Sequence, residues 1–204
     1  MDTVRLSITS YLDDEHYDSQ LSPRMRRLSQ LHWSPLEVIR AAAGFLCDKP
    51  GSKVIDIGSG IGKFCITAAQ HYPDCDFYGI EQRKDLHGIA LLSRQNSSVV
   101  SNTHFIHGDF TELDYNNYDG IYFFNSFAEN LCTFGRIDNS VQYSPSLYNY
   151  YANYFYKILE NKENGTRLVT YHGNDGDLPS SYQLIDSSFN NYLKMYIKSD
   201  PSHS

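Results

Sequence analysis

A short stretch in the first third of the chain, Asp56-Ile-Gly-Ser-Gly-Ile-Gly62, holds residues whose types and spacing indicate ligand chemistry. Its three glycines alternate directly after an apolar run, although each glycine costs backbone entropy on folding. A glycine turn that opens a helix lets backbone amides approach a bound ligand. A dinucleotide turn requires G-x-G-x-x-G, but Lys63 occupies the third glycine position. The carboxylate of Asp56 better suits a ligand that carries an amine or a sulfonium.

Two more acids end strand-like segments further along the chain. Glu81 lies 19 residues after Gly62 and ends the segment 76–81, where a carboxylate accepts hydrogen bonds from both hydroxyls of a ribose. Charge-assisted hydrogen bonds of this kind contribute roughly 1.5–3 kcal/mol each. Asp109 ends the segment 103–109 and is placed to accept from an adenine amine, with Phe110 against the ring. The alternative is a structural glycine turn followed by ordinary surface acids.

These residues resemble the cofactor site of the class I S-adenosylmethionine-dependent methyltransferases. The matching segments are V-I-D-I-G-S-G-I-G, Y-G-I-E and H-G-D-F, in the order of that family, and the resemblance covers about residues 33–175. It implies an α/β fold: a Rossmann-like seven-stranded sheet, mostly parallel with one antiparallel strand, and helices on both faces. It implies S-adenosyl-L-methionine as cofactor, held at its methionine part, ribose and adenine by these residues: Asp56, Gly58, Ser59, Gly60, Gly62, Glu81, Asp109, Phe110 and Asn125.

The segment after the fourth apolar run, Asn125-Ser126-Phe127, lies where class I enzymes set their acceptor chemistry. Methylases of nucleic-acid bases carry Pro-Pro there, so base methylation is disfavoured. The segment resembles the Asn-Asn-Phe-Ala-Phe run of the lysine methyltransferases of the disruptor-of-telomeric-silencing type. The whole chain also looks like bacterial methyltransferase-like proteins of undefined substrate that share a helix starting Trp-Ser/Thr-Pro-Leu-Glu. The long substrate-binding region and basic tail of the eukaryotic enzymes are not matched, so a histone substrate is not implied.

Four residues near these strand ends are candidates for the acceptor side. Asn125 is a candidate catalytic residue that orients the acceptor, with a turn cap as the alternative. Glu129 is a candidate contact for a basic acceptor, and Tyr171 a candidate lining residue. His172 is a candidate general base, because histidine exchanges protons near neutral pH.

The elements that position these residues follow from apolar patterning. Ser34, Pro35 and Glu37 form a capping-box pattern that predicts a helix start, and Trp33 fits a hydrophobic staple. Strands are expected at 53–58, 76–81, 103–109, 120–125 and 166–172, helices at 62–72, 82–96 and 144–165, and a closing hairpin at 182–186 and 193–198. Strands that alternate with helices predict a mostly parallel sheet, whose ligands bind beyond the carboxyl ends of the strands.

The composition of the chain limits its expected partners, metal sites and cellular location. The 204 residues carry a net charge of −7, which disfavours duplex nucleic acid as a partner, and the basic run 23–28 fits a solvated helical face. Four scattered cysteines without a C-x-x-C pair predict neither a metal site nor a redox motif, and free thiols in a reducing compartment are expected. We expect a cytoplasmic protein without a membrane span. Residues 1–30 are expected to form one helix and a loose arm before a methyltransferase domain at 31–204.

Two other functions stay open at this point. One is a non-catalytic module that binds S-adenosylmethionine or its demethylated product. The other is a nicotinamide-dependent oxidoreductase, which the Lys63 position disfavours. The acceptor, which we expect to be a protein side chain or a small molecule, and the oligomeric state are not determined by the sequence.

Overall fold

The computed structural model describes residues 13–97, 101–131, 135–173 and 175–199. The helices are α1 (Asp14–Ser19), α2 (Pro23–His32), α3 (Leu36–Leu46), α4 (Lys63–His71), α5 (Lys84–Asn96) and α6 (Pro145–Asn161), with short 3-10 helices η1 (Phe110–Glu112), η2 (Ala128–Asn130) and η3 (Asp175–Asp177). The strands are β1 (Lys53–Ile57), β2 (Asp76–Glu81), β3 (Thr103–His107), β4 (Gly120–Phe123), β5 (Arg167–Tyr171), β6 (Tyr182–Ser188) and β7 (Leu193–Lys198).

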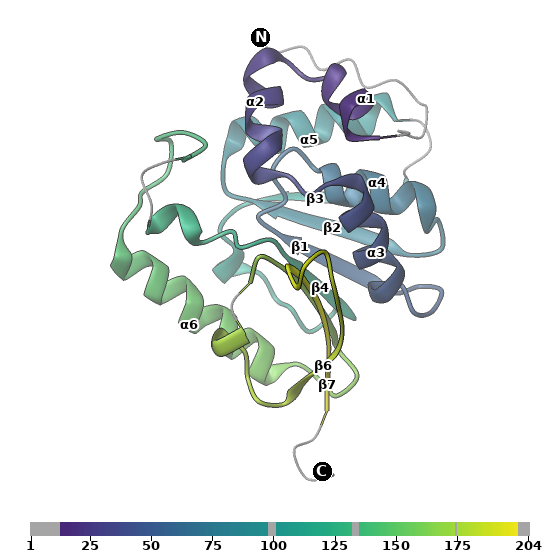
Figure 1. Ribbon diagram of the computed structural model, residues 1–204, viewed down its shortest axis with the longest axis vertical. Coiled ribbons are helices and arrows are strands. Elements are labelled where there is room, and N and C mark those ends of the chain that lie inside the picture. Colours follow the sequence, from purple (N-terminus) through teal and green to yellow (C-terminus); the bar gives the residue numbers. More distant parts are fainter. Residues whose placement is uncertain (1–12, 98–100, 132–134, 174, 200–204) are drawn as a thin grey trace.

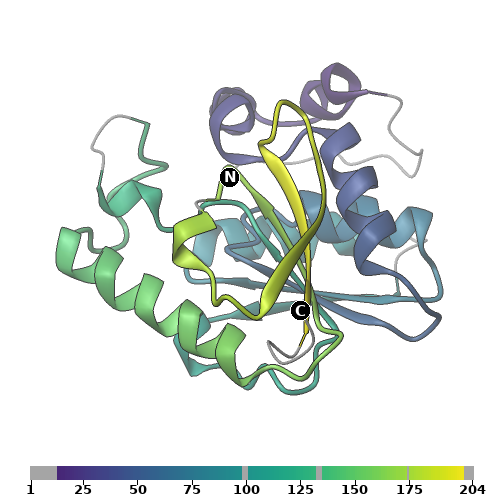
Figure 2. The same ribbon diagram turned by 60° about the horizontal axis from the view of Figure 1, so that its bottom comes forward.

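The described strands form one seven-stranded sheet in the order β3-β2-β1-β4-β5-β7-β6 (Figure 1). The first five pair in parallel, and β7 runs antiparallel to both β5 and β6. Helices α3, α4 and α5 pack on one face, and α6 covers the other, as Figure 2 shows. The predicted Rossmann-like α/β fold is confirmed.

The central strands are buried on both faces, which explains their continuous apolar runs. Residues 54–57 of β1 and all of β4 are buried, because helices cover the sheet on both sides. The hydrophobic core consists of two clusters of buried residues. One lies between the sheet and helices α3 and α4, and the other lies between the sheet and α6. Because β1, β2, β4 and β5 are parallel, their carboxyl ends lie at one edge of the sheet.

The entry to α3 differs from the expected capping box. Helix α3 starts at Leu36, and Ser34 does not cap it, because the Ser34 hydroxyl is hydrogen-bonded to the buried Tyr122 hydroxyl. Glu37 is exposed. The Leu36 amide instead donates to the carboxylate of Asp14, 22 residues upstream. By contrast, the predicted cap of α6 is confirmed, since Ser144 Oγ accepts from the Leu147 amide at 3.0 Å.

The segment before α3 also differs from the expectation of one helix and a loose arm. It forms two helices, α1 and α2, and Tyr17 of α1, Met25 of α2 and Leu21 between them lie in the same hydrophobic cluster as α3 and α4. Residues 1–12 of the expected arm lie outside the described residues. The N-terminal helices therefore share the core of the domain.

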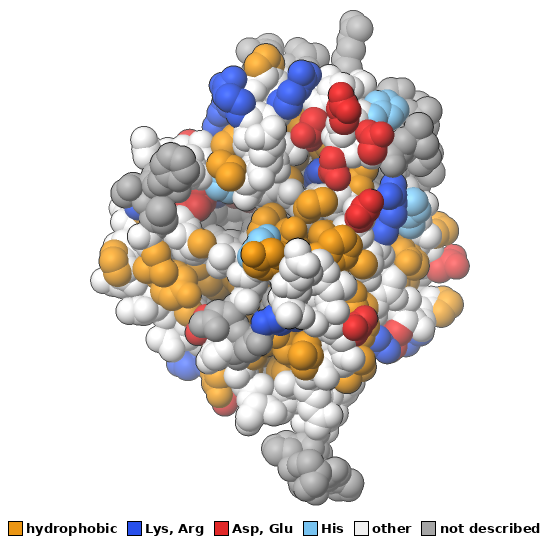
Figure 3. All heavy atoms as spheres, in the orientation of Figure 1, with side chains coloured by type: hydrophobic (Ala, Val, Ile, Leu, Met, Phe, Trp, Pro, Cys, Tyr) orange, Lys and Arg blue, Asp and Glu red, His pale blue; other side chains and the backbone are white. Residues whose placement is uncertain are grey.

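The basic run on α2 is partly neutralised by nearby acids. Arg24 pairs with Asp85 at 3.1 Å and with Asp138 at 3.5 Å, and Arg26 donates to backbone carbonyls at the end of α1. Figure 3 shows acidic side chains gathered over α1 beside the basic ones of α2. Among the described residues, no helix combines the length and apolarity that crossing a membrane requires.

Candidate active site

A cleft of about 310 Å³ opens at the carboxyl ends of β1, β2 and β4. Its walls come from the glycine turn after β1, the residues just after β2 and β4, the segment before α3, and residues 135–143. Nine of the predicted site residues line it: Asp56, Gly58, Ser59, Gly60, Glu81, Asp109, Phe110, Asn125 and Glu129. The topology of the sheet thus brings together side chains that lie up to 73 positions apart in the sequence.

The glycine turn is held by the protein itself. The amides of Gly58 and Ser59 both donate to the Ile80 carbonyl at 3.0 Å, and the Gly60 amide donates to Glu81 Oε2 at 3.0 Å. The Gly62 amide donates to the Ser59 carbonyl at 2.8 Å. The interpretation that these amides approach a ligand is therefore corrected, because their hydrogen bonds brace the turn against β2.

The glycines are needed for their positive φ angles and for close approach. Gly58 has φ +79°, and a Cβ on it would lie 2.5 Å from Ser126 Oγ. A Cβ on Gly60 would lie 3.0 Å from Trp33 Nε1. Gly62 lies outside the cleft lining, and its Cα faces Phe105, where a Cβ would lie 2.5 Å from the ring. Its predicted cofactor contact is thus replaced by a packing role between α4 and β3.

Asp56 and Glu81 place two buried carboxylates in the floor of the cleft. Each residue is 4% exposed. Burial raises the pKa of Asp56 well above its ordinary value, and the nearby charge of Glu81 raises it further. Burial also raises the pKa of Glu81, although hydrogen bonds from two backbone amides oppose this. Two buried carboxylates in one cleft favour a cationic ligand, whose charge offsets their lost hydration.

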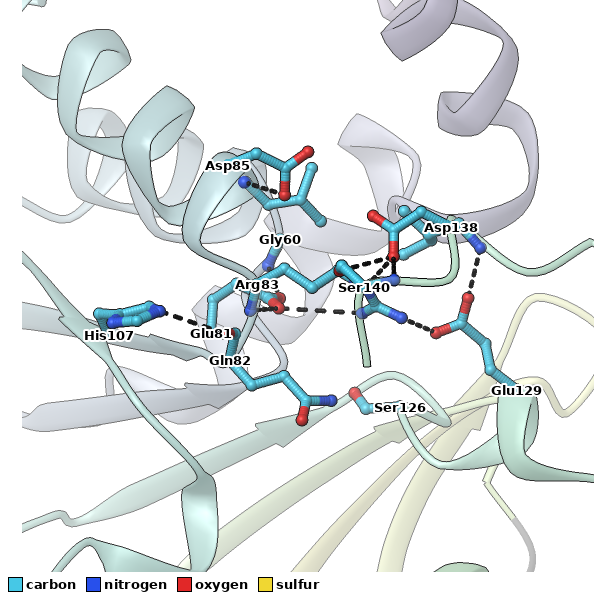
Figure 4. Close-up of polar contacts among 12 residues, drawn as sticks. Gly60, Glu81, Gln82, Arg83, Asp85, His107, Ser126, Glu129, Asp138 and Ser140 are labelled. Atoms are coloured by element: carbon cyan, nitrogen blue, oxygen red, sulfur yellow. Dashed lines mark hydrogen bonds and ion pairs between the residues drawn. The ribbon is translucent and has the colours of Figure 1, made fainter. Parts of the chain in front are cut away.

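Arg83 joins Glu81 to the loops that cover the cleft, as Figure 4 shows. The Arg83 amide donates to Glu81 Oε1 at 2.8 Å, and its guanidinium lies 3.8 Å from the same oxygen. The guanidinium also donates to Glu129 at 2.5 Å and to the Tyr143 hydroxyl at 2.8 Å, and it lies 3.5 Å from Asp138. Arg83 is 5% exposed and was missed by the sequence analysis. The sequence feature that could have indicated Arg83 is its position two residues after Glu81, the acid that ends β2.

Glu129 is used by the protein rather than left free for a basic acceptor. One carboxylate oxygen accepts from Arg83, and the other accepts from the Ile137 amide at 2.6 Å. These bonds fix η2 against the segment 135–143 at the rim of the cleft (Figure 4). Glu129 thus forms a structural ion pair while it lines the cleft, and its contact with a basic acceptor stays a prediction.

Asp109 and Phe110 form the far end of the cleft. Asp109 Oδ1 caps η1 by accepting from the Thr111 amide at 2.9 Å, and Oδ2 accepts from the Tyr151 hydroxyl at 2.8 Å. Phe110 stacks on Phe127 at a centroid distance of 5.0 Å. This end therefore presents an aromatic wall of three rings beside a carboxylate that is already oriented.

The roof of the cleft comes from residues before and after the glycine turn. Trp33 Nε1 is buried and has no hydrogen-bond partner among the described residues, although Trp33 lines the cleft. Lys63 also lines the cleft, is 3% exposed and pairs with Asp14 at 2.6 Å. An unpaired buried N–H is costly, so the indole is a ready donor for a ligand.

Asn125 lies at the meeting point of two cavities. It follows β4 with φ +38°, a strained angle for a residue with a side chain. Its carbonyl accepts from the Ala128 amide at 3.1 Å, so its backbone does form a turn cap. Asn125 lines the cleft and also a second cavity that includes His172. Tyr171 lines neither cavity and packs against Phe124 and His172, so its predicted pocket role is corrected.

The residues of the cleft fit S-adenosylmethionine. The buried carboxylates match a ligand with cationic groups, and the glycines at 58 and 60 let Ser126 and Trp33 pack closely against the turn that lines the cleft. Glu81 receives one backbone hydrogen bond on each oxygen, so lone pairs stay open for a ribose diol. The unpaired Trp33 indole adds a donor beside Gly60 of the glycine turn.

Several solved structures share this fold. The RNA methyltransferase of Salinibacter ruber in complex with S-adenosyl-L-homocysteine has a TM-score of 0.58 at 19% identity, over 84% of this chain and 95% of that one. TrmN from Thermus thermophilus has a TM-score of 0.61 at 18% identity, over 86% of this chain and 52% of that one. The magnesium protoporphyrin IX methyltransferase of Synechocystis PCC 6803 with bound S-adenosylmethionine has a TM-score of 0.56 at 14% identity, over 94% and 86%. No curated protein is similar to the chain at a significant level.

A family model described as a methyltransferase domain matches residues 48–202, which is most of the chain. The strand order, the buried carboxylates and the glycine turn agree with that match. The narrower resemblance to the disruptor-of-telomeric-silencing type stays a prediction. The chain belongs to the methyltransferase domain family and is an S-adenosylmethionine-dependent methyltransferase of class I.

Proposed function

We propose that the chain transfers a methyl group from S-adenosylmethionine, bound in the cleft, to a small molecule or a protein side chain. The observation that carries the assignment of the cleft is the pair of buried carboxylates, Asp56 and Glu81, beside a glycine turn at adjacent strand ends. S-adenosylmethionine supplies a sulfonium methyl group that is already activated for displacement. The protein therefore acts by binding, orienting and excluding water.

Each wall of the cleft has a role in this proposal. Glu81 accepts from the ribose hydroxyls, and Arg83 keeps its carboxylate oriented. Asp56 offsets the positive charge of the methionine part. Asp109 and Phe110 flank the adenine, and the Tyr151 hydroxyl holds the Asp109 carboxylate in place. Asn125, strained at the end of β4, orients the acceptor next to the methyl group.

The neighbours in fold support the cofactor but leave the acceptor open. The Salinibacter and Synechocystis proteins bind S-adenosylhomocysteine and S-adenosylmethionine, while their names give different acceptors, RNA and magnesium protoporphyrin IX. At identities of 19% and 14%, neither acceptor transfers to this chain. The pairing of Arg24 on α2 with two acids and the net charge of −7 argue against duplex nucleic acid as a partner.

Cofactor binding and methyl transfer are tested in two steps. Calorimetric titration with S-adenosylmethionine and S-adenosylhomocysteine should show binding, and NAD should show none. A ligand at 100 times its dissociation constant stabilises a fold by about 2.7 kcal/mol, so the melting temperature should rise. Transfer of labelled methyl into a fractionated extract then separates an enzyme from a binding module. Binding of NAD alone would overturn the proposal.

We also propose a cytoplasmic location. Cys47, Cys65 and Cys75 are free thiols, and Cys65 is buried beside β2. Free thiols of this kind persist in reducing compartments.

A further inference from the structure

A second cavity of about 210 Å³ lies under α6, at the carboxyl ends of β4 and β5. Asn125, Phe127 and Ala128 line both this cavity and the cofactor cleft. One layer of residues therefore separates the two spaces, and Asn125 reaches both. The acceptor of a methyl group must reach the cofactor from such a neighbouring space.

The lining of this cavity is mostly apolar and aromatic. Rings come from β4, from the residue before η2 and from α6, and smaller side chains complete the wall: Phe123, Phe127, Ala128, Leu131, Tyr148, Ala152, Phe155 and Leu178. Asp177 is its one charged side chain among the described lining residues, and it lies at an exposed position. An anion finds no cationic partner here. The binding of an apolar ligand is stabilised by burial of its surface against the rings.

Thr170 places an unpaired hydroxyl in this wall. Side chains alternate along β5, so Thr170 lies on the same face as Leu168, which packs under α6. Thr170 is 2% exposed, and its Oγ1 has no hydrogen-bond partner among the described residues. Buried hydroxyls are almost always paired, so an orphan in a cavity wall indicates a polar group supplied by a ligand.

Two strained residues stand at the ends of the strands that bound the cavity. Asn125 lies two residues after β4 with φ +38°, and His172 directly follows β5 with φ +55°. Residues other than glycine adopt such φ angles at a cost of about 1–3 kcal/mol, and residues in this conformation cluster at functional sites. The His172 amide donates to the Tyr192 carbonyl at 2.9 Å, and its ring packs on Phe124 and Tyr192. These contacts hold the imidazole at the cavity wall.

We propose that the second cavity binds the methyl acceptor, and that this acceptor is a small uncharged molecule with one ring that carries a hydroxyl or an aromatic amine group. The inference rests on the proposed function, since it names the substrate class of the same site. The cavity of about 210 Å³ accommodates a substituted ring. Thr170 Oγ1 and the His172 imidazole are the polar anchors, and Asn125 directs the reactive group toward the cleft.

The test uses 4-methylphenol as an uncharged probe and 4-methylbenzoate as its anionic match. The full chain is first saturated with S-adenosylhomocysteine, which is confirmed by calorimetry and keeps the probes out of the cofactor cleft. Saturation-transfer NMR titrations then measure probe binding. 4-Methylphenol should bind at least tenfold more tightly than 4-methylbenzoate. Equal or tighter binding of the benzoate would overturn the proposed substrate class.

Two variants locate the bound probe. Ala152→Leu fills the cavity from α6 and should abolish binding of 4-methylphenol, whereas Asn153→Leu, on the exposed side of the same helix, should not. Thr170→Val keeps the shape and removes the orphan hydroxyl, so probe binding should weaken about tenfold without a fall in melting temperature. If probe binding survives Ala152→Leu, the cavity is not the acceptor site.

The two proposals fail in different ways. All variants should bind S-adenosylhomocysteine like the parent chain, because Ala152 and Thr170 do not line the cofactor cleft. Normal cofactor binding without probe binding would reject the acceptor pocket and leave the methyltransferase site intact. Loss of cofactor binding in the parent chain would reject both.

Discussion

Replacing Glu81 by glutamine separates the cofactor role of this carboxylate from its role in the fold. Glu81 accepts from the Gly60 amide at 3.0 Å on one oxygen and from the Arg83 amide at 2.8 Å on the other. Glutamine keeps one acceptor and faces the second amide with its own N–H group. Leaving one buried donor unpaired costs about 1–3 kcal/mol. However, burial raises the pKa of Glu81, so removing its charge returns part of that cost.

The effect on cofactor affinity should be larger than the effect on stability. A ribose diol donates two charge-assisted hydrogen bonds to a carboxylate, and glutamine offers one neutral acceptor. The loss is about 3 kcal/mol, because hydrogen bonds to charged groups contribute about 1.5–3 kcal/mol each. At about 1.4 kcal/mol for each tenfold change, Glu81→Gln should weaken S-adenosylhomocysteine binding about 100-fold.

Calorimetric titration and thermal unfolding of the same sample measure both effects. Glu160→Gln, at an exposed position on α6, is the matched control and should change neither quantity. A melting temperature that falls while the dissociation constant stays within threefold of the parent would refute the reasoning. Glu81 would then be a brace for the glycine turn, and the ribose contact would lie elsewhere.

Three further predictions test the cleft. Asn125→Ala should lower turnover about 100-fold and leave S-adenosylhomocysteine affinity nearly unchanged, since one well-placed polar group contributes about 3 kcal/mol in a transition state. A parallel loss of affinity, measured by calorimetry, would assign Asn125 to the cofactor site. Arg83→Met should weaken cofactor binding and raise the proteolytic sensitivity of the segment 135–143, and equal proteolysis of variant and parent would contradict this. Because the folded pKa of Asp56 is raised, the apo fold should lose stability as pH rises from the ordinary carboxyl range through that raised pKa, and the melting shift caused by S-adenosylmethionine should grow over the same window. Asp56→Asn should flatten this pH dependence, and an unchanged profile in the variant would refute the assignment.

The sheet and its helices were predictable from the sequence because central parallel strands are apolar throughout. The predicted bounds 76–81 coincide with β2, and the hairpin segments 182–186 and 193–198 fall on β6 and β7. The Ser144 cap was also predictable, since its partner amide lies three residues away. Local patterns and strand-end placement were thus sufficient for the fold and for nine of the residues that line the cleft.

Long-range partners were not predictable in the same way. Ser34 fits a capping box by spacing, yet its hydroxyl is bound by Tyr122, 88 positions away, and Asp14 takes over the cap. Glu129 has the residue type for a basic acceptor, but Arg83 reaches it across the sheet edge. In both cases a tertiary partner competes for a side chain whose local sequence suggests another use.

Asp14 makes the N-terminal helices part of the cleft. Its carboxylate accepts from the Leu36 amide and pairs with Lys63, so one side chain ties α1 to the start of α3 and to the start of α4. The match to the methyltransferase domain begins at residue 48, after α1, α2 and α3. A fragment cut at that boundary would divide one hydrophobic core and remove Trp33 from above Gly60. The folded unit is therefore larger than its family match, and the segment 13–47 supplies part of the cover beside the glycine turn.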